Sequence, residues 1–129
     1  FACTNPQTFQ FYSVPPPADS PTNFSAHLRT LLADPGRLHF AVIAGGTLVG
    51  STAYYDARKE HRALEIGYTF YHPAHRGTLV NPACKLLLIG HAIERLGCVR
   101  VQIKTDRRNT ISQRAIERRR DGVRQRAAE

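Results

Sequence analysis

The feature that most constrains the fold of this chain is a strand, a helix and a second strand between residues 63 and 105. Residues 63–71 (ALEIGYTFY) interleave polar side chains with apolar and aromatic ones, which predicts a strand. Pro73 ends it, because proline cannot donate to a ladder. Residues 98–105 (CVRVQIKT) alternate polar and apolar side chains and predict the second strand. Two strands joined by a helix should lie parallel, with a right-handed crossover.

The helix between these strands is predicted from its end signals and from its apolar stripe. Asn81 is a good N-cap, Pro82 suits the first helical position, and Gly97 stands where a left-handed C-cap is expected. Lys85 and Arg95 are expected outside the stripe. The side chains that we expect to face the sheet are Leu86, Ile89, Ile93 and Leu96.

Residues 76–81 (RGTLVN) join the first strand to this helix. The first backbone N–H groups of a helix have no internal partners, and the helix dipole is positive there. A turn that carries Arg76 and Gly77 into such a terminus can bind a phosphate or pyrophosphate. The alternative is an ordinary strand-to-helix turn with an incidental arginine, and the loop alone leaves both interpretations open.

The rest of the chain completes a mixed α/β (α+β) arrangement in one domain, residues 1–129. An antiparallel meander should precede the parallel unit, and a second helix should follow it to give a βαβα unit. The further expected elements are a helix from 22 or 23 to 33 with Phe24, Leu28, Leu31 and Leu32 as its apolar face, a strand at 38–44, a hairpin turn at Gly45-Gly46, a strand at 48–55, a charged turn at 56–61 and a helix from 110 to about 119.

The composition sets limits on compartment and partners. The formal net charge is +8, and residues 100–129 hold ten of the 18 Lys and Arg but four of the ten Asp and Glu. Such a basic end attracts phosphates, on a nucleotide cofactor or on nucleic acid, or is simply a solvated face. Three cysteines are too few for a disulfide framework, which suits a reducing cytoplasm, and we expect Cys84 and Cys98 to be buried. No apolar run approaches membrane-spanning length, and no secretory leader is evident.

Two motifs resemble those of a known family. The loop RGTLVN before a helix, followed by K-T-D-x-x-N-x-x-S-x-x-A-I-E from Lys104 to Glu117, is similar to the GNAT superfamily of acetyl-CoA-dependent N-acetyltransferases. The resemblance covers roughly residues 38–123 and is nearest to the RimJ/RimL type, which acetylates N-terminal amines of ribosomal proteins. Leu79 and Asn81 stand where the pyrophosphate loop of this family usually has small residues.

This resemblance implies a fold, a co-substrate and a set of binding residues. In GNAT proteins the strands corresponding to 63–71 and 98–105 splay apart, and the pantetheine arm of acetyl-CoA enters the opening. The acceptor is expected to be a primary amine, either a protein N-terminus or a small amine. The residues that the resemblance assigns to acetyl-CoA are Phe70, Tyr71, Arg76, Gly77, Thr78, Leu79, Val80, Asn81 and Asn109.

The resemblance also implies two catalytic residues. Glu65 lies near the position of the general base, which would remove a proton from the acceptor ammonium, although a Glu on the solvent face of a strand is the alternative. Ser112 is the remaining candidate for the acid that protonates the leaving thiolate, since Ile116 stands where many relatives have a tyrosine. No metal site is expected, because His72 and His75 have no further ligands at suitable spacing.

The sequence leaves two alternative functions open and predicts an open edge in the sheet. The chain could be a non-catalytic, acyl-CoA-binding relative, or a basic nucleic-acid-binding domain, which the lack of interleaved aromatics disfavours. We also expect truncation at both ends, because the family begins with a strand that we do not find before Pro15 and closes with a strand pair that 122–125 only begins. The strand with Val99, Val101 and Ile103 would then have an open edge that favours a homodimer.

Overall fold

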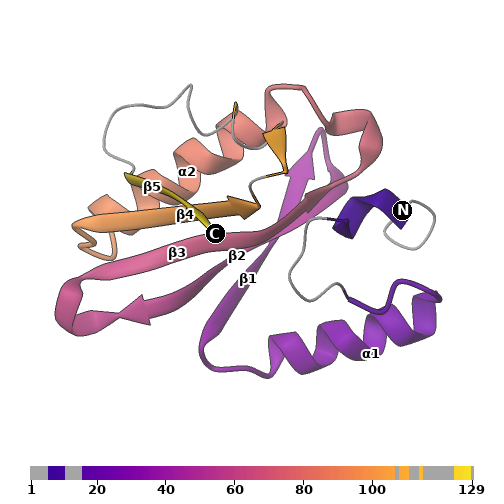
Figure 1. Cartoon of the computed structure of the whole chain (residues 1–129), viewed down its shortest axis with the longest axis horizontal. Helices are drawn as coiled ribbons and strands as arrows, with labels where there is room; N and C mark the ends of the chain where they lie inside the picture. Colours follow the sequence, from indigo (N-terminus) through magenta and orange to yellow (C-terminus); the bar gives the residue numbers. More distant parts are fainter. Residues whose placement is uncertain (1–5, 11–15, 107, 111–113, 115–123, 129) are drawn as a thin grey trace.

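A computed structural model gives the structure of residues 6–10, 16–106, 108–110, 114 and 124–128 (Figure 1). Its elements confirm the expected mixed α/β class, with an antiparallel meander before a parallel unit. In chain order they are η1 (Pro6–Phe9), α1 (Pro21–Leu32), β1 (Arg37–Ala44), β2 (Thr47–Arg58), η2 (Lys59–His61), β3 (Ala63–Tyr71), η3 (Pro73–His75), α2 (Val80–Glu94), β4 (Arg100–Asp106) and β5 (Arg124–Ala128).

The sheet has five strands in the order β1-β2-β3-β4-β5. β1 and β2 are antiparallel, and their turn is formed by Gly45 and Gly46, whose φ angles of 57° and 78° fit the hairpin turn that two glycines predict. β2 and β3 are also antiparallel. β3 and β4 are parallel, as the crossover through α2 predicts.

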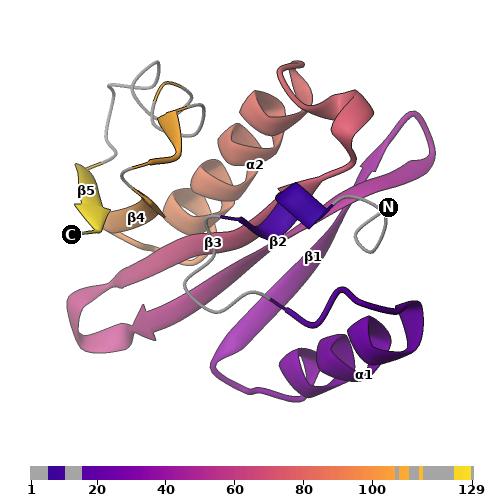
Figure 2. The ribbon, with the colours of Figure 1, turned by 45° about the vertical axis from the view of Figure 1, so that its right-hand side comes forward.

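The helices lie on opposite faces of this sheet. Figure 2 shows α2 on one face, and α1 with the short helix η1 on the other. On the α1 side, Phe9 of η1 and Phe24 of α1 pack against Phe70 of β3, with ring centroids 5.2 and 6.2 Å from the Phe70 ring. Phe9 and Phe24 therefore cover the same strand that leads into the loop before α2.

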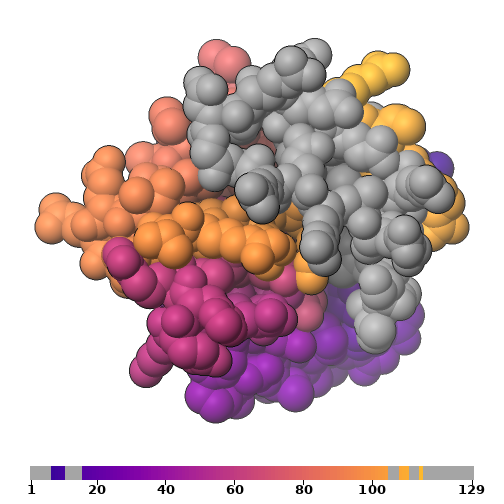
Figure 3. Space-filling model, turned by 60° about the vertical axis from the view of Figure 1, so that its left-hand side comes forward, coloured from indigo at the N-terminus to yellow at the C-terminus, as the bar shows by residue number. Residues whose placement is uncertain are grey.

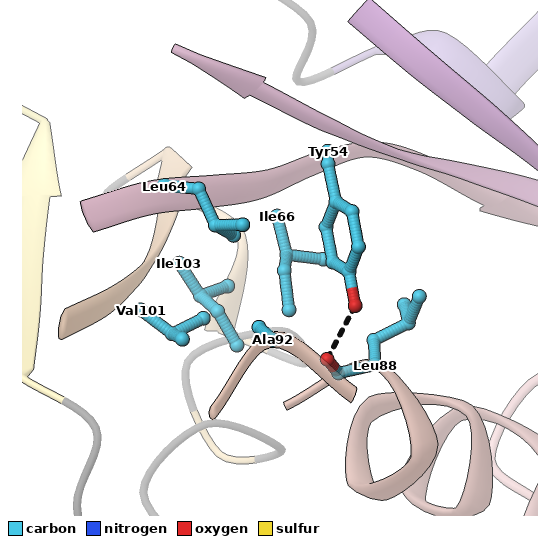
Figure 4. Close-up of a cluster of buried hydrophobic side chains, with 7 residues drawn as sticks. All are labelled: Tyr54, Leu64, Ile66, Leu88, Ala92, Val101 and Ile103. Carbon is cyan, nitrogen blue, oxygen red and sulfur yellow. Dashed lines mark hydrogen bonds between the residues drawn. The ribbon is translucent and has the colours of Figure 1, made fainter. Parts of the chain in front are cut away.

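The main hydrophobic core lies between α2 and strands β2, β3 and β4. Ile66 and Ala92 are fully buried, and the Tyr54 hydroxyl donates a hydrogen bond to the carbonyl of Leu88 (Figure 4). This bond gives a buried hydroxyl its partner and fixes the helix against β2. The cluster consists of Tyr54, Leu64, Ile66, Leu88, Ala92, Val101 and Ile103.

The predicted inward stripe of α2 is wrong by one residue in phase. Leu86, Ile93 and Leu96 are 70%, 48% and 52% exposed, whereas the buried positions are Lys85, Leu88 and Ala92. Ile89 is partly buried at the margin of the core. Residues 86–89 are four consecutive apolar residues, so the sequence does not fix the phase. The contact with Tyr54 and the close approach at Ala92 fix it instead.

The helix boundaries also differ from those predicted. α2 begins at Val80 after an N-cap residue, Leu79, that makes no side-chain capping bond, so Asn81 is not the cap. α1 begins at Pro21, because the Ser20 hydroxyl accepts from the N–H of Asn23. Its predicted apolar face is only partly buried, and Leu32 is 67% exposed.

Three smaller expectations also need correction or qualification. β2 runs on to Arg58, through part of the predicted charged turn, and β4 begins at Arg100, two residues later than expected. Cys84 and Cys98 are partly buried at the core rather than fully buried. Most of the helix predicted from 110 to 119 lies outside the described residues.

The expected open edge of β4 is wrong over most of that strand. β5 pairs in parallel with β4, from Gln102 opposite Arg124 to Asp106 opposite Ala128. Arg124 and Gln125, which belong to the segment predicted to begin a closing strand pair, lie in this strand. Figure 3 views the molecule from the end at which β2 turns into β3, in magenta, with β4 in orange beside it.

Within the described part of the chain, no helix is long and apolar enough to cross a membrane.

Two glycines test this packing in opposite directions. A Cβ atom on Gly50 of β2 would lie 2.4 Å from the carbonyl oxygen of Phe70, whereas a Cβ on Gly90 of α2 would meet no atom within 4 Å beyond its chain neighbours and the backbone of its own helix. We expect Gly50→Ala to lower the free energy of unfolding by about 1–3 kcal/mol. Gly90→Ala should raise it by about 0.5–1 kcal/mol, because alanine favours a helix interior. Urea denaturation of both variants checks this, and a stable Gly50→Ala protein would contradict the β2–β3 packing.

Candidate functional site

β3 parts from β4 halfway along its length. The two strands pair from Ala63 opposite Arg100 to Ile66 opposite Ile103, yet β3 continues to Tyr71 and β4 to Asp106. The described ladder between them therefore ends while both strands run on. The predicted opening between β3 and β4 is present, with its apex at Ile66 and Ile103.

A bulge in β3 lies beside this apex. Ala53 of β2 is opposite Gly67 and Ser51 is opposite Phe70, so two β3 residues stand against one β2 residue. One of the two is Tyr68, whose φ of 52° is left-handed, an uncommon state for a residue with a side chain. A bulge bends its strand and increases the local twist. It thus accounts for the departure of β3 from β4.

Arg76 ties the loop before α2 to its surroundings. Its Nε donates to the carbonyl oxygen of Tyr71 at 3.1 Å, and an Nη donates to the hydroxyl of Thr8 at 3.0 Å. The residue is nevertheless exposed at the surface. Arg76 therefore holds the end of β3 and the N-terminal segment together while it keeps a positive charge beside the loop.

The following residues shape the start of α2. The Thr78 hydroxyl donates to the carbonyl of His75 and accepts from the N–H of Val80, at 2.7 and 3.3 Å. The Asn81 side chain accepts a hydrogen bond of 3.0 Å from the Tyr71 hydroxyl. Asn81 thus links α2 to the end of β3 instead of capping the helix, which the sequence could not distinguish.

This loop presents backbone donors at the positive end of a helix. Gly77 has a φ of 72°, and Leu79 is 82% exposed. Among the described residues, no acceptor is found for the N–H groups of Gly77, Leu79 and Asn81. Free N–H groups, the helix dipole and the Arg76 guanidinium all favour an anion at this point. The residues predicted for a pyrophosphate therefore lie together at the start of α2, and their role there stays a prediction.

Glu65 lies at the other end of the opening, six residues before Tyr71 and roughly 20 Å from it along the strand. It is 2% exposed, so it is not on a solvent face. Lys104 Nζ donates to Glu65 Oε1 at 2.7 Å, and Oε2 has no hydrogen-bond partner among the described residues. Since Leu64 and Ile66 face α2, the Glu65 side chain lies on the opposite face of the sheet.

Tyr55, which the sequence did not single out, lies beside this carboxylate. Tyr55 lies opposite Glu65 in the β2–β3 register, and its ring is 5.0 Å from that of Tyr68. Burial raises the pKa of Tyr55 above its usual range, and the Glu65 carboxylate raises it further. The Tyr55 hydroxyl thus stays protonated at neutral pH. Only the alternation of β2 could have indicated that Tyr55 shares a face with Glu65.

Two basic residues, Arg37 and His39, pack against the ring of Tyr68. The Arg37 guanidinium is 4.6 Å from the centroid of the Tyr68 ring, and the His39 ring is 6.1 Å from it. Burial first, and then the charge of Arg37, lower the pKa of His39 below its ordinary value of 6.5. The buried Nε2 of His39 has no hydrogen-bond partner among the described residues. Tyr68 therefore packs against Arg37, His39 and Tyr55.

On the α2 face, the opening carries a polar cluster instead of apolar packing. Lys85 is 8% exposed, which corrects its predicted place outside the stripe, and its Nζ donates to the Thr69 hydroxyl at 3.0 Å. The Thr69 and Thr52 hydroxyls are 2.8 Å apart. This cluster joins α2 to the bulged part of β3, so helix, bulge and opening form one connected unit.

The remaining predicted residues are placed only in part. Asn109 follows β4 and is half-buried, close to the start of a helical segment at Thr110. Ser112 lies outside the described residues, so its role stays a prediction. The described part of the chain brings no group of three or more His, Cys, Asp or Glu side chains into a metal-binding arrangement.

Comparison with known proteins gives a consistent picture. The family model of the GNAT acetyltransferase domain matches residues 1–119. A candidate acetyltransferase from T. thermophilus is 38% identical and has a TM-score of 0.81, and the match covers 88% of this chain and 60% of that one. A second candidate acetyltransferase, also 38% identical, has a TM-score of 0.79, with 88% of this chain and 58% of that one covered.

A GCN5-related N-acetyltransferase from Brucella melitensis shares the fold at 23% identity and a TM-score of 0.76, covering 91% of this chain and 55% of that chain. The chain thus spans about 60% of the length of the first two solved relatives. No curated protein matches it.

The lowered pKa of His39 makes stability depend on pH. The folded chain binds fewer protons at His39 than the unfolded chain does, so this contribution to stability is present above pH 6.5 and is lost as the pH falls. We expect the free energy of unfolding to fall less between pH 7.5 and 5.5 in His39→Phe than in the wild type. His61→Gln, at an exposed residue, is the matched control. Equal pH dependence in all three proteins would contradict a His39 that the fold holds neutral.

Proposed function

The chain belongs to the family of GNAT acetyltransferase domains, and from this premise we propose that it transfers an acetyl group from acetyl-CoA to a primary amine. The observation that carries the proposal is the opening between β3 and β4, which has an anion-binding loop at one end and a buried carboxylate at the other. A co-substrate with a pyrophosphate and a remote thioester needs two such sites, separated along one channel.

We assign the pyrophosphate to Arg76 and to the N–H groups of residues 77–81, of which that of Val80 also donates to the Thr78 hydroxyl. Phe70 and Tyr71 would lie along the pantetheine arm, on the β3 side of the opening, and Asn109 would contact it from beyond β4. The fit is supported by the exposed, left-handed turn at Gly77, by available donors and by net positive charge. The thioester would supply an activated acetyl group, and the chain would supply its position and a proton acceptor.

Glu65 is the proposed general base. It is paired with Lys104 and buried where water competes poorly, and one carboxylate oxygen is not engaged by the described residues. That oxygen could accept a proton from the acceptor ammonium, directly or through water. Tyr55 and Tyr68 would form the wall against which the ammonium rests, since aromatic faces attract cations. Ser112 remains the proposed acid.

The finer assignment is to the RimJ/RimL type, with a protein N-terminus as the acceptor and a cytoplasmic location. It rests on the two sequence motifs. The rival is a non-catalytic relative that binds acyl-CoA. The ion pair on Glu65 supports this rival, because Lys104 already occupies one carboxylate oxygen. Thiol release in the presence of a panel of amines and N-terminal peptides separates the two, since only an enzyme releases CoA in step with an acceptor.

A substitution in the loop tests the binding half of the proposal. We expect Arg76→Ala to weaken acetyl-CoA binding in calorimetry by about 1.5–3 kcal/mol, the range for a charged hydrogen bond. Arg95→Ala, at the opposite end of α2, is the matched control and should bind as the wild type does. Because Arg76 also contacts Tyr71 and Thr8, thermal melting must show that the variant is folded. Unchanged affinity would remove Arg76 from the site.

A substitution in β3 tests the catalytic half. Glu65→Gln keeps the shape of the side chain but cannot accept a proton, so we expect turnover to fall by roughly a hundredfold or more with acetyl-CoA affinity nearly intact. Glu60→Gln, at an exposed residue of η2, is the control. If Glu65→Gln turns over as the wild type and keeps its pH–rate profile, the base lies elsewhere.

A further inference from the structure

A primary amine of the chain itself already lies on the proposed base. Lys104 Nζ is 2.7 Å from Glu65 Oε1. The two residues come from the two strands that part, Glu65 one residue before the last paired position of β3 and Lys104 one residue after that of β4. Their ion pair therefore spans the apex of the opening, where the acetyl end of the co-substrate would arrive.

The three lysines of the chain have three different environments. The Lys104 side chain is 44% exposed, so an acetyl group could reach it and remain there. Lys59 is exposed in η2, away from any described carboxylate contact. Lys85 is 8% exposed and donates to Thr69. Only Lys104 combines access with a proton acceptor at hydrogen-bond distance.

We propose that Lys104 is a self-acetylation site, modified in cis by the acetyl-CoA bound to the same chain. The proposal rests on the proposed function, and it adds an acceptor that no comparison indicates. The geometry resembles the productive one for any acceptor, because a candidate base must lie about 2.6–3.2 Å from the group that gives up the proton. The Lys104 ammonium already meets this condition before an external amine binds.

The chemistry balances with acetyl-CoA as the one co-reactant. The ammonium gives a proton to Glu65, and the nitrogen attacks the thioester carbonyl carbon. A C–N bond forms and the C–S bond breaks. The second nitrogen proton passes to the departing thiolate, and the proton on Glu65 passes to water. The products are an acetamide on Lys104, free CoA and one proton.

Acetylation would also change the site. It removes the positive charge that pairs with Glu65 and leaves a neutral acetamide beside a carboxylate that is 2% exposed. The acetamide would stay at the apex of the opening and obstruct the approach of an external amine to Glu65. Self-acetylation at Lys104 would therefore reduce turnover of the chain toward its other acceptors.

The test follows acetyl groups residue by residue. The purified chain is incubated with acetyl-CoA that carries a deuterated acetyl group, and peptide mass spectrometry measures the label at Lys59, Lys85 and Lys104. We expect label at Lys104 to exceed the chemical background at Lys59 by about tenfold or more. The labelled fraction should not depend on protein concentration, because the reaction is in cis. Lys104→Arg should lose the label, and Lys59→Arg should keep it.

Glu65→Gln distinguishes catalysed labelling from simple reactivity. The variant breaks the ion pair and exposes the amine, so a merely accessible Lys104 would gain label. We expect it instead to fall to the Lys59 level, with circular dichroism confirming the fold. Equal label at Lys104 and Lys59 in the wild type, or undiminished label in Glu65→Gln, overturns the proposal. Calorimetry with acetyl-CoA and thiol release with the amine panel, on the same sample, separate self-acetylation from the proposed function. Binding and amine acetylation without label at Lys104 refute self-acetylation alone. Absent binding refutes both.

Discussion

The point at which β3 stops pairing with β4 determines the rest of this structure. Up to Ile66 the two strands form an ordinary parallel ladder, and beyond it they diverge. The cause lies on the other side of β3, where the Tyr68 bulge against β2 twists the strand. A left-handed tyrosine is unfavourable by itself, and it persists because the rings of Tyr55 and His39 and the guanidinium of Arg37 pack around it.

α2 keeps this opening in shape from one face of the sheet. It contacts the strands through three polar links that follow one another along the helix: Asn81 with Tyr71, Lys85 with Thr69, and the Leu88 carbonyl with Tyr54. These links lie on both sides of the bulge, so the helix cannot move relative to one end of β3 without disturbing the other. The loop that would bind phosphate and the apex that would hold the thioester are therefore fixed in one rigid relation.

Much of the fold followed from local sequence signals. The strand at 63–71 was predicted with its observed ends, and the glycine hairpin and the parallel crossover were also correct. These features depend on alternation and on turn chemistry, which act over a few residues. The phase of α2 and the burial of Lys85 could not be obtained in this way, because the run of apolar residues at 86–89 leaves several inward faces equally plausible. Lys104 on Glu65 was equally out of reach, since that contact joins strands 39 residues apart.

The loop before α2 carries an arginine, Arg76, which reacts poorly with acyl donors. Fifteen of the 18 basic residues in this chain are arginines. A guanidinium keeps its charge at any accessible pH and is a poor nucleophile, whereas a lysine amine is a competitor for any acyl donor that passes it. If Arg76 binds the pyrophosphate as proposed, the loop would attract an anionic thioester with a cation that the thioester cannot acetylate. The cation of the loop is therefore safe from the acetyl donor, in contrast to the Lys104 amine at the apex of the opening.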